Sequence, residues 1–397
     1  MANEMADEMT DEASLAKELT AHLAALIAIP SAYPPGNTVA ISAYAAQILE
    51  AAGYATEILA REKGIDNVVA RVSGSKPGPS LVFNAHTDTV SVGARENWAS
   101  DPFTAVEADG HVTGLGAGNC KGAMAAQLWL AQEVARAGGP ARGELVFTFV
   151  GDEERLGHEG LYFLREAGAV KPDILVLGAQ TENGLIVEER GVLWLAITTR
   201  GRAAHAGNPA AGDNAIGRMI RILSHLDGTL GPRLDTRVAG DKRSTVNIGM
   251  IRGGHNTNVV PDTCTVEIDR RLLPEEPVDD ALAEMKEIVA DAGEPADRVQ
   301  VAFLTGTNGF SAATDGNGVT AFVEAIAARI GKPPAFLNAT GVSDGRYFAD
   351  DGIEIVNFGP GAGTQGHAAN ESVPVTELVD AALIQRDLVD RLLGLNG

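Results

Sequence analysis

Three segments of this chain carry residues that could bind a metal ion or move a proton. The first is His86 with Asp88, directly after the largely apolar run 81–85. An imidazole at the end of a strand is a candidate metal ligand, and a carboxylate two residues away can orient its ring. The same pair also suits a hydrogen-bonded histidine that binds no ligand. The pattern predicts a metal site only if other segments bring acids or histidines to the same place.

The second segment is the acid pair Glu153 and Glu154, which follows the apolar run 145–150. Adjacent side chains that leave a strand point in different directions, so one carboxylate can bind a metal while the other takes a proton from water. Acid pairs are also common on solvated loops, and this pair alone is a weak signal. The third segment holds His367, after an apolar run and a glycine-rich turn, and supplies a second candidate imidazole.

Helical and extended patterns alternate over most of the chain and place these segments at the ends of strands. We predict strands over 55–59, 67–72, 81–84, 144–150, 174–177 and 353–358, and helices over 14–29, 38–52, 123–137, 318–330 and 376–393. Such alternation indicates an α/β layer with a mixed, largely parallel sheet and flanking helices. Sites in these sheets lie outside the carboxyl ends of the strands, so we expect the three segments to meet at one edge.

From residue 191 the pattern changes to a smaller α+β unit inserted into the first. Its β-rich segments are 192–199, 245–251 and 263–273, and its helical segments are 213–226 and 278–291. The chain of 397 residues exceeds the roughly 250 to 300 residues at which one hydrophobic core stops growing. We therefore predict a catalytic α/β domain over 1–190 and 302–397, and an inserted domain over 191–301.

The composition excludes several classes of partner. With 53 acidic and 31 basic residues, the formal charge of −22 repels nucleic acid and anionic membranes. The two cysteines, Cys120 and Cys264, exclude a disulfide framework and fit a reducing compartment. We find no secretory signal in residues 1–12, and no apolar run reaches the ~18 residues that span a bilayer. We predict a cytoplasmic protein with no nucleic-acid or membrane partner.

A series of short motifs resembles the dinuclear zinc exopeptidases and aminoacylases, the family that includes acetylornithine deacetylase, succinyl-diaminopimelate desuccinylase and carboxypeptidase G. In chain order the motifs are His86-Thr87-Asp88, Gly114 to Gly122, Gly151 to Glu154, Gly201 to His205, Asn258 to Pro261 with Arg271, and Ser343 to Arg346. Each motif is short, but their order and spacing extend over nearly the whole chain.

The resemblance implies a role for each residue of the predicted metal site. His86 would bind one zinc ion, with Asp88 behind it to orient the ring. Glu153 would be the general base that activates water, and Glu154 with His367 would hold the second zinc ion.

The resemblance also implies that the inserted domain is a lid that forms a homodimer. His205 would reach the active site of the partner subunit and stabilise the oxyanion. Asn258 and Arg271 would hold the substrate, because the planar fork of an arginine suits a carboxylate. Ser343 and Gly341 complete the expected substrate-binding set.

Two positions depart from the family pattern. Asn119 stands where the family has an aspartate that bridges the two zinc ions, and Ala179 stands where it has the glutamate of a Glu-Pro-Thr segment. Asparagine offers a neutral carbonyl oxygen and alanine offers no ligand. Catalytic zinc takes about three protein ligands, so the position at His86 is expected to be empty or weak. We expect at most one zinc-type ion per chain, on Glu154 and His367 with Asn119 as a tentative third ligand.

These residues favour an enzyme that cleaves an amide bond in an N-acyl amino acid or small peptide bearing a free carboxylate. Glu153 would act as base at a depleted metal site. One alternative is a metal-independent enzyme of the same fold that acts on a cyclic imide, an ester or a C–N bond. Another is a catalytically silent homologue that binds a carboxylate ligand.

Overall fold

The computed structural model describes residues 2–396 except 241, 313, 338 and 340, with side chains from residue 12 onward. The chain divides into two compact units. Unit 1 runs to Val187 and includes 312–338 and 343–397, whereas unit 2 comprises 188–311 and 339–342. The sequence-based limits of 191 and 301 fall inside those of unit 2. They differ because β16 (Val299–Thr307) pairs with β11 (Gly191–Arg200) and so belongs to the inserted unit.

Unit 1 is built on a six-stranded sheet. Its order is β18 (Glu354–Phe358), β9 (Ile174–Gly178), β4 (Lys76–His86), β8 (Arg142–Val150), β3 (Asn67–Ser73) and β2 (Ala55–Leu59). The first four strands are parallel to one another, and β3 and β2 are antiparallel to their neighbours. The prediction of a mixed, largely parallel sheet is confirmed.

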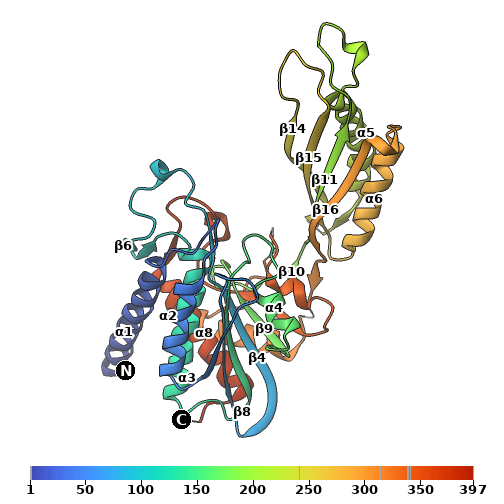
Figure 1. Ribbon diagram of the computed structural model, residues 1–397. Helices are drawn as coiled ribbons and strands as arrows, with labels where there is room; N and C mark the ends of the chain where they lie inside the picture. The colour runs from blue at the N-terminus through green and yellow to red at the C-terminus, as the bar shows by residue number, and fades with distance from the viewer. Residues whose placement is uncertain (1, 241, 313, 338, 340, 397) are drawn as a thin grey trace. The chain divides into compact units, whose positions relative to one another are not determined.

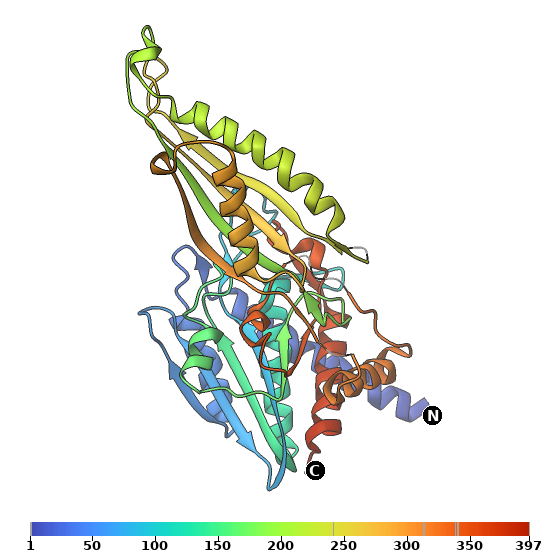
Figure 2. The same cartoon turned by 90° about the vertical axis from the view of Figure 1, so that its right-hand side faces the viewer.

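Helices cover both faces of this sheet, and Figures 1 and 2 show α4 (Leu161–Glu166) on the face opposite to α2, α3 and α8. The helices on that second face are α2 (Val39–Ala51), α3 (Ala123–Arg136) and α8 (Val375–Leu393), with α1 (Ala2–Ile27) packed on α3 and α8. α7 (Asn317–Ile330) packs on α8 and β18. Because both faces are covered, the last six residues of β4 are all buried.

The sequence patterns did not predict the shortest elements of unit 1. These are the three-stranded sheet of β19 (Ser372–Pro374), β7 (His111–Thr113) and β6 (Val106–Ala108), and the pair of β1 (Ala32–Tyr33) with β5 (Thr89–Val90). A strand of two or three residues is too short to show an alternating pattern.

Unit 2 is a four-stranded antiparallel sheet in the order β14 (Thr245–Gly253), β15 (Thr263–Leu272), β11 and β16. Two helices, α5 (Ala215–Thr236) and α6 (Val278–Asp291), pack on one face of it, as Figure 1 shows. Alternate residues of β15 are buried, which is the pattern of a sheet with one covered face. Two short pairs, β10 (Glu188–Glu189) with β17 (Phe310–Ser311) and β12 (Val238–Ala239) with β13 (Lys242–Arg243), complete the unit.

Cys120 and Cys264 are both free and buried, which fits the prediction that no disulfide framework holds this chain. In the described part of the chain, no helix is both long enough and apolar enough to span a membrane.

Candidate active site

The carboxyl ends of the parallel strands in unit 1 bring the three candidate segments together. β4 ends at His86, which lies beside Val150 at the end of β8, directly before the acid pair. Asn119 lies in the segment η2 (Ala117–Gly122), which directly precedes α3, and its own φ of −112° and ψ of 91° are not helical. His367 lies in the loop after β18 and adopts a positive φ of 66°.

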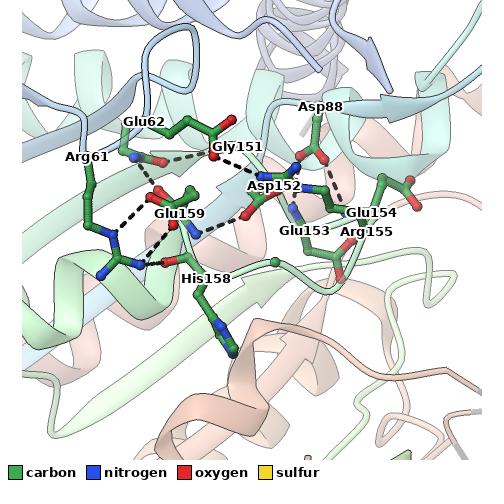
Figure 3. Close-up of polar contacts among 12 residues, drawn as sticks. Arg61, Glu62, Asp88, Gly151, Asp152, Glu153, Glu154, Arg155, His158 and Glu159 are labelled. Carbon is green, nitrogen blue, oxygen red and sulfur yellow. Dashed lines mark hydrogen bonds and ion pairs between the residues drawn. The ribbon is translucent and has the colours of Figure 1, made fainter. Parts of the chain in front are cut away.

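Asp88 holds the main chain of the acid pair. Its buried carboxylate accepts the backbone N–H of Glu153 at 3.3 Å and that of Glu154 at 3.1 Å, as the dashed lines in Figure 3 show. The ring of His86 lies closer to the carbonyl oxygen of Asp88, 2.9 Å from Nδ1, than to its carboxylate, 3.6 Å away. The expected orienting contact is therefore made mainly through the main chain, while the carboxylate fixes the two glutamates.

Asp152, directly before the acid pair, stabilises the turn that follows the pair. Its φ of 72° is one that aspartate tolerates better than most residues, because its side chain can bond to nearby main-chain groups. Its carboxylate accepts the backbone N–H of Glu159 at 2.9 Å and pairs with Arg155. Arg61 in turn binds the Glu159 carboxylate at 3.0 Å and the main-chain oxygen of His158 at 2.9 Å (Figure 3).

Asn119 connects the two histidines and the second glutamate. Its Nδ2 group donates to Oε1 of Glu154 at 2.9 Å and lies 3.4 Å from Nε2 of His367. Its Oδ1 atom lies 3.3 Å from Nε2 of His86. Nε2 of His367 is also 3.0 Å from Oε2 of Glu154. The Asn119 amide thus lies at the centre of this hydrogen-bonded group, at the position where the resemblance implies a bridging aspartate.

The charges around His86 favour its protonated form. Burial disfavours the imidazolium, yet the carboxylate of Glu153, 3.9 Å from Nε2, and Asp88 raise the pKa of His86 well above its usual range. A protonated ring donates from Nδ1 to Asp88 and from Nε2 to the Oδ1 atom of Asn119. Both ring nitrogens are then satisfied, as a buried polar group requires.

The two glutamates of the pair differ in environment. Burial raises the pKa of Glu153 to about 8, although nearby His86 opposes the shift. Glu154 accepts hydrogen bonds from Asn119 and His367, and its hydrogen bond raises the pKa of His367. Glu153 is therefore the carboxylate better suited to exchanging a proton near neutral pH.

The described part of the site contains one group of candidate metal ligands. Among the described residues, ligand atoms of His86, Glu153 and Glu154 lie within 4.8 Å of one another. At the two positions where the resemblance implies further acidic ligands, Ala179 has no donor atom in its side chain and Asn119 is uncharged. Cys120 is not in that group, and burial raises the pKa of its thiol to about 11, which disfavours the thiolate that zinc binds.

Asp344 and Arg346 form a buried ion pair near Glu153 that the sequence analysis quoted only as a family motif. Their charged groups are 3.3 Å apart, and both act electrostatically on Glu153. Burial raises the pKa of Asp344 to about 6. Ser343, predicted to bind substrate, accepts the backbone N–H of Gly345 at 3.2 Å and caps this short turn, η5 (Asp344–Phe348).

Two further residues, Gln180 and Glu371, contact the site and had no predicted role. Glu371 follows His367 by four residues, and Gln180 follows Ala179. Their only sequence signal is this proximity to residues of the motifs.

The remaining predicted residues lie in unit 2. His205 and Asn258 are neighbours, because the Asn258 carbonyl accepts the backbone N–H of Ala206 at 3.0 Å and His205 pairs with Val259. Both side chains are exposed, and so is Gly341.

Arg271 lies elsewhere in unit 2 and is already paired. Its guanidinium binds the carboxylate of Asp269 through two bonds of 2.9 and 3.0 Å. It sits beside Val192 in the sheet, at the end of β15 opposite to Thr263, which leads back to the loop of Asn258. Within a single chain, unit 2 therefore does not bring Arg271 and Asn258 together.

Comparisons with known proteins show which family this chain resembles. Residues 187–297 match a profile described as "Peptidase dimerisation domain", and residues 67–180 match one described as "Peptidase family M28". The chain is 33% identical to a succinyl-diaminopimelate desuccinylase of Acidiphilium cryptum, over 87% of this chain and 91% of the relative. It is 31% identical to that of Granulibacter bethesdensis, over 83% and 87% of the two chains.

Solved structures show the same fold. An M20 family metallo-carboxypeptidase, Sso-CP2 from Sulfolobus solfataricus, superposes with a TM-score of 0.79 at 17% identity, covering 95% of this chain and 99% of that one. Human carnosine dipeptidase 1 superposes with a TM-score of 0.77 at 15% identity, covering 97% and 98%.

Proposed function

This chain belongs to the M20 peptidase family and is a hydrolase of amide bonds, and we propose that its substrate is an N-acyl amino acid or small peptide with a free carboxylate. The observation that carries the proposal is the position of the acid pair beside His86. The carboxylate of Asp88 holds the main chain of this pair in place. The relatives are named as desuccinylases of an N-acyl amino acid, which supports this class of substrate.

Glu153 would be the general base. Its carboxylate would take a proton from the attacking water and return it to the leaving amine, which is the usual role of a carboxylate in amide hydrolysis. Its raised pKa, about 8, supports this role because a base works best when its pKa lies near the working pH. Asp88 would keep Glu153 in place through the main chain.

We propose at most one zinc-type ion, held by Glu154 and His367. The 3.0 Å separation of their ligand atoms supports this pair. The other candidate group, His86 with Glu153 and Glu154, would use the proposed base as a ligand. Asn119 directs Nδ2, not Oδ1, toward Glu154 and His367. It would therefore become a third ligand only if its side-chain amide rotated by about half a turn, so that Oδ1 faced the ion. When bound, the ion would supply Lewis acidity toward the amide carbonyl and the attacking water.

A homodimer would complete the substrate site. Within one chain, His205 and Asn258 lie at the opposite end of the unit 2 sheet from Arg271. We propose that Arg271 of one subunit meets the partner's His205 and Asn258, so that the oxyanion and the substrate carboxylate are bound from different subunits. Ser343 and Gly341 would line the same site, and a cytoplasmic location stays a prediction.

A second candidate is metal-independent hydrolysis of an activated bond, such as a cyclic imide or ester. It is favoured by the hydrogen bonds of Asn119, which satisfy His86 and Glu154 without an ion. A silent carboxylate-binding homologue is a third reading, which any turnover that depends on Glu153 would exclude.

The test replaces Glu153 by glutamine and measures hydrolysis of a panel of N-succinyl and N-acetyl amino acids. We expect kcat to fall by about 10²- to 10⁴-fold, the usual contribution of a general base. E166Q, at an exposed acid of α4, is the control and should keep the parent rate. An E153Q variant with the parent rate would refute the role of the base. Turnover of imides or esters alone, unchanged by chelation, would favour the second candidate.

A further inference from the structure

A single buried carboxylate, Glu371, holds the loop that carries Asn119. It is 2% exposed and accepts three backbone N–H groups, from Gly116 at 3.1 Å, Gly118 at 3.0 Å and Asn119 at 2.6 Å. It also accepts the side-chain amide of Gln180 at 3.2 Å. Hydrogen bonds to an ionised acceptor are roughly twice as strong as neutral ones, so this loop is held firmly.

The same carboxylate lies in the segment that carries His367, four residues earlier. The main-chain oxygen of Glu371 accepts the N–H of Gly114 at 3.0 Å, which adds a second tie between the two segments. Asn119 and His367 both contact Glu154. Glu371 therefore connects the two loops whose side chains meet at the second glutamate of the acid pair.

Gln180 adds a third segment to this connection. A Cβ atom built on Gly118 would lie 2.0 Å from Nε2 of Gln180, and one on Gly366 would lie 2.6 Å from its Oε1. The Gln180 amide thus lies between the loops of Asn119 and His367, and a side chain at either glycine would require this amide to move. Ala179 provides no ligand, but the next residue, Gln180, provides an amide that is hydrogen-bonded to Glu371.

A buried lysine lies in the same part of the site. Lys121 is fully buried, donates from Nζ to the main-chain oxygen of Ile29 at 3.0 Å, and interacts electrostatically with Glu371. Burial lowers the pKa of Lys121 to about 7, and the carboxylate of Glu371 opposes that shift by favouring the protonated amine.

We propose that Glu371 is a positioning residue, which acts through Asn119 and His367 to set the hydrogen bonds that both make with Glu154. Gln180 supports Glu371 in this role, because its hydrogen bond links the segment after β9 to the same carboxylate. The inference rests on the proposed function, in which Glu154 and His367 form the centre beside the base.

The test compares E371Q with the parent enzyme. Glutamine keeps the shape, but its NH₂ group would face at least one of the three backbone N–H donors. Residues that support a metal-binding group typically contribute 10- to 100-fold, so we expect kcat to fall by about that factor with KM within about threefold of the parent. In protein labelled with ¹⁵N-histidine, the imidazole resonances of His367 and His86 should move, with H367N used to assign His367.

E354Q is the matched control. Glu354 also accepts two backbone N–H groups, from Gly318 at 3.1 Å and Val319 at 2.9 Å, but it caps α7 at the amino end of β18, away from the site. E354Q should lower Tm and leave kcat and the imidazole resonances unchanged. An E371Q variant that behaves in the same way would overturn the proposal, because Glu371 would then be merely structural.

If E371Q does not fold, the variant Q180A provides a second test. It removes one hydrogen bond to Glu371 and should shift the His367 resonance in the same direction by a smaller amount, whereas an unchanged resonance would overturn the proposal. The resonances report on positioning even if the parent hydrolyses no amide, so failure of the proposed function and failure of this inference are distinguishable.

Discussion

At the scale of single residues, the site is organised by an amide in place of a carboxylate. Asn119 accepts from His86 and donates to Glu154, and an aspartate cannot do both. N119D would place the new carboxylate against that of Glu154, and a bound cation would relieve their repulsion. We expect N119D/A179E to bind more zinc per chain than the parent and to gain Tm on addition of zinc, as measured by elemental analysis and thermal unfolding.

N119D/A179Q is the control for that double variant, because it adds similar volume at position 179 without a charged ligand. It should bind less zinc than N119D/A179E. If the double variant holds no more zinc than the parent, the residues at positions 119 and 179 do not limit zinc binding.

At the scale of elements, one carboxylate joins both helices of unit 2 to its sheet. Glu284 on α6 binds Arg233 of α5, Arg237 directly after α5, and the fully buried Arg270 of β15. Burial alone would raise the pKa of Glu284, but these arginines lower it to about 2. A lowered carboxyl pKa adds stability above the unfolded-state value near 4.5, and this stability is lost as the pH falls toward 2.

E284Q should therefore destabilise the protein at pH 7 and flatten the acid branch of its stability curve. A shift from 4.5 to about 2 corresponds to about 3 kcal/mol, an order-of-magnitude value. Urea unfolding at pH 7 and pH 3 measures the effect. E287Q, at an exposed position of the same helix, is the control. Equal pH dependence of E284Q and the parent would contradict the assignment.

At the scale of the whole molecule, unit 2 has an exposed strand edge suited to a second copy of the chain. β14 is the outermost strand of its sheet, with Ile248 and Ile251 46% and 56% exposed, and Ile220 of α5 is 57% exposed. Exposed apolar side chains beside a free edge favour association. I248R/I251R should change the native mass from twice the 41.2 kDa chain mass to that of one chain, measured by light scattering, with loss of activity.

V106K, at an exposed apolar position of unit 1, is the control and should keep the parent mass. Mixing inactive E153Q and H205A subunits offers a second check, because a heterodimer would contain one site with both groups intact. A monomeric, active parent would refute the shared site.

The sequence by itself determined the architecture of unit 1 and the strand ends at which the polar segments meet. Alternating periodicities predict an α/β sheet, and parallel strands bring His86 and the acid pair to one edge whatever the details of packing. The order of the motifs also identified the family. These properties depend on local spacing, which one sequence contains.

Only the tertiary structure decided which groups those residues contact. The carboxylate of Asp88 binds amides more than sixty residues away, and Glu371 binds a loop about 250 residues earlier in the chain. Arg271 proved to be paired with Asp269, at the far end of the sheet from Asn258. β16 joined unit 2 because its partner β11 begins that unit. Hydrogen bonds and strand pairing between distant segments form only when the chain folds, so no local pattern records them.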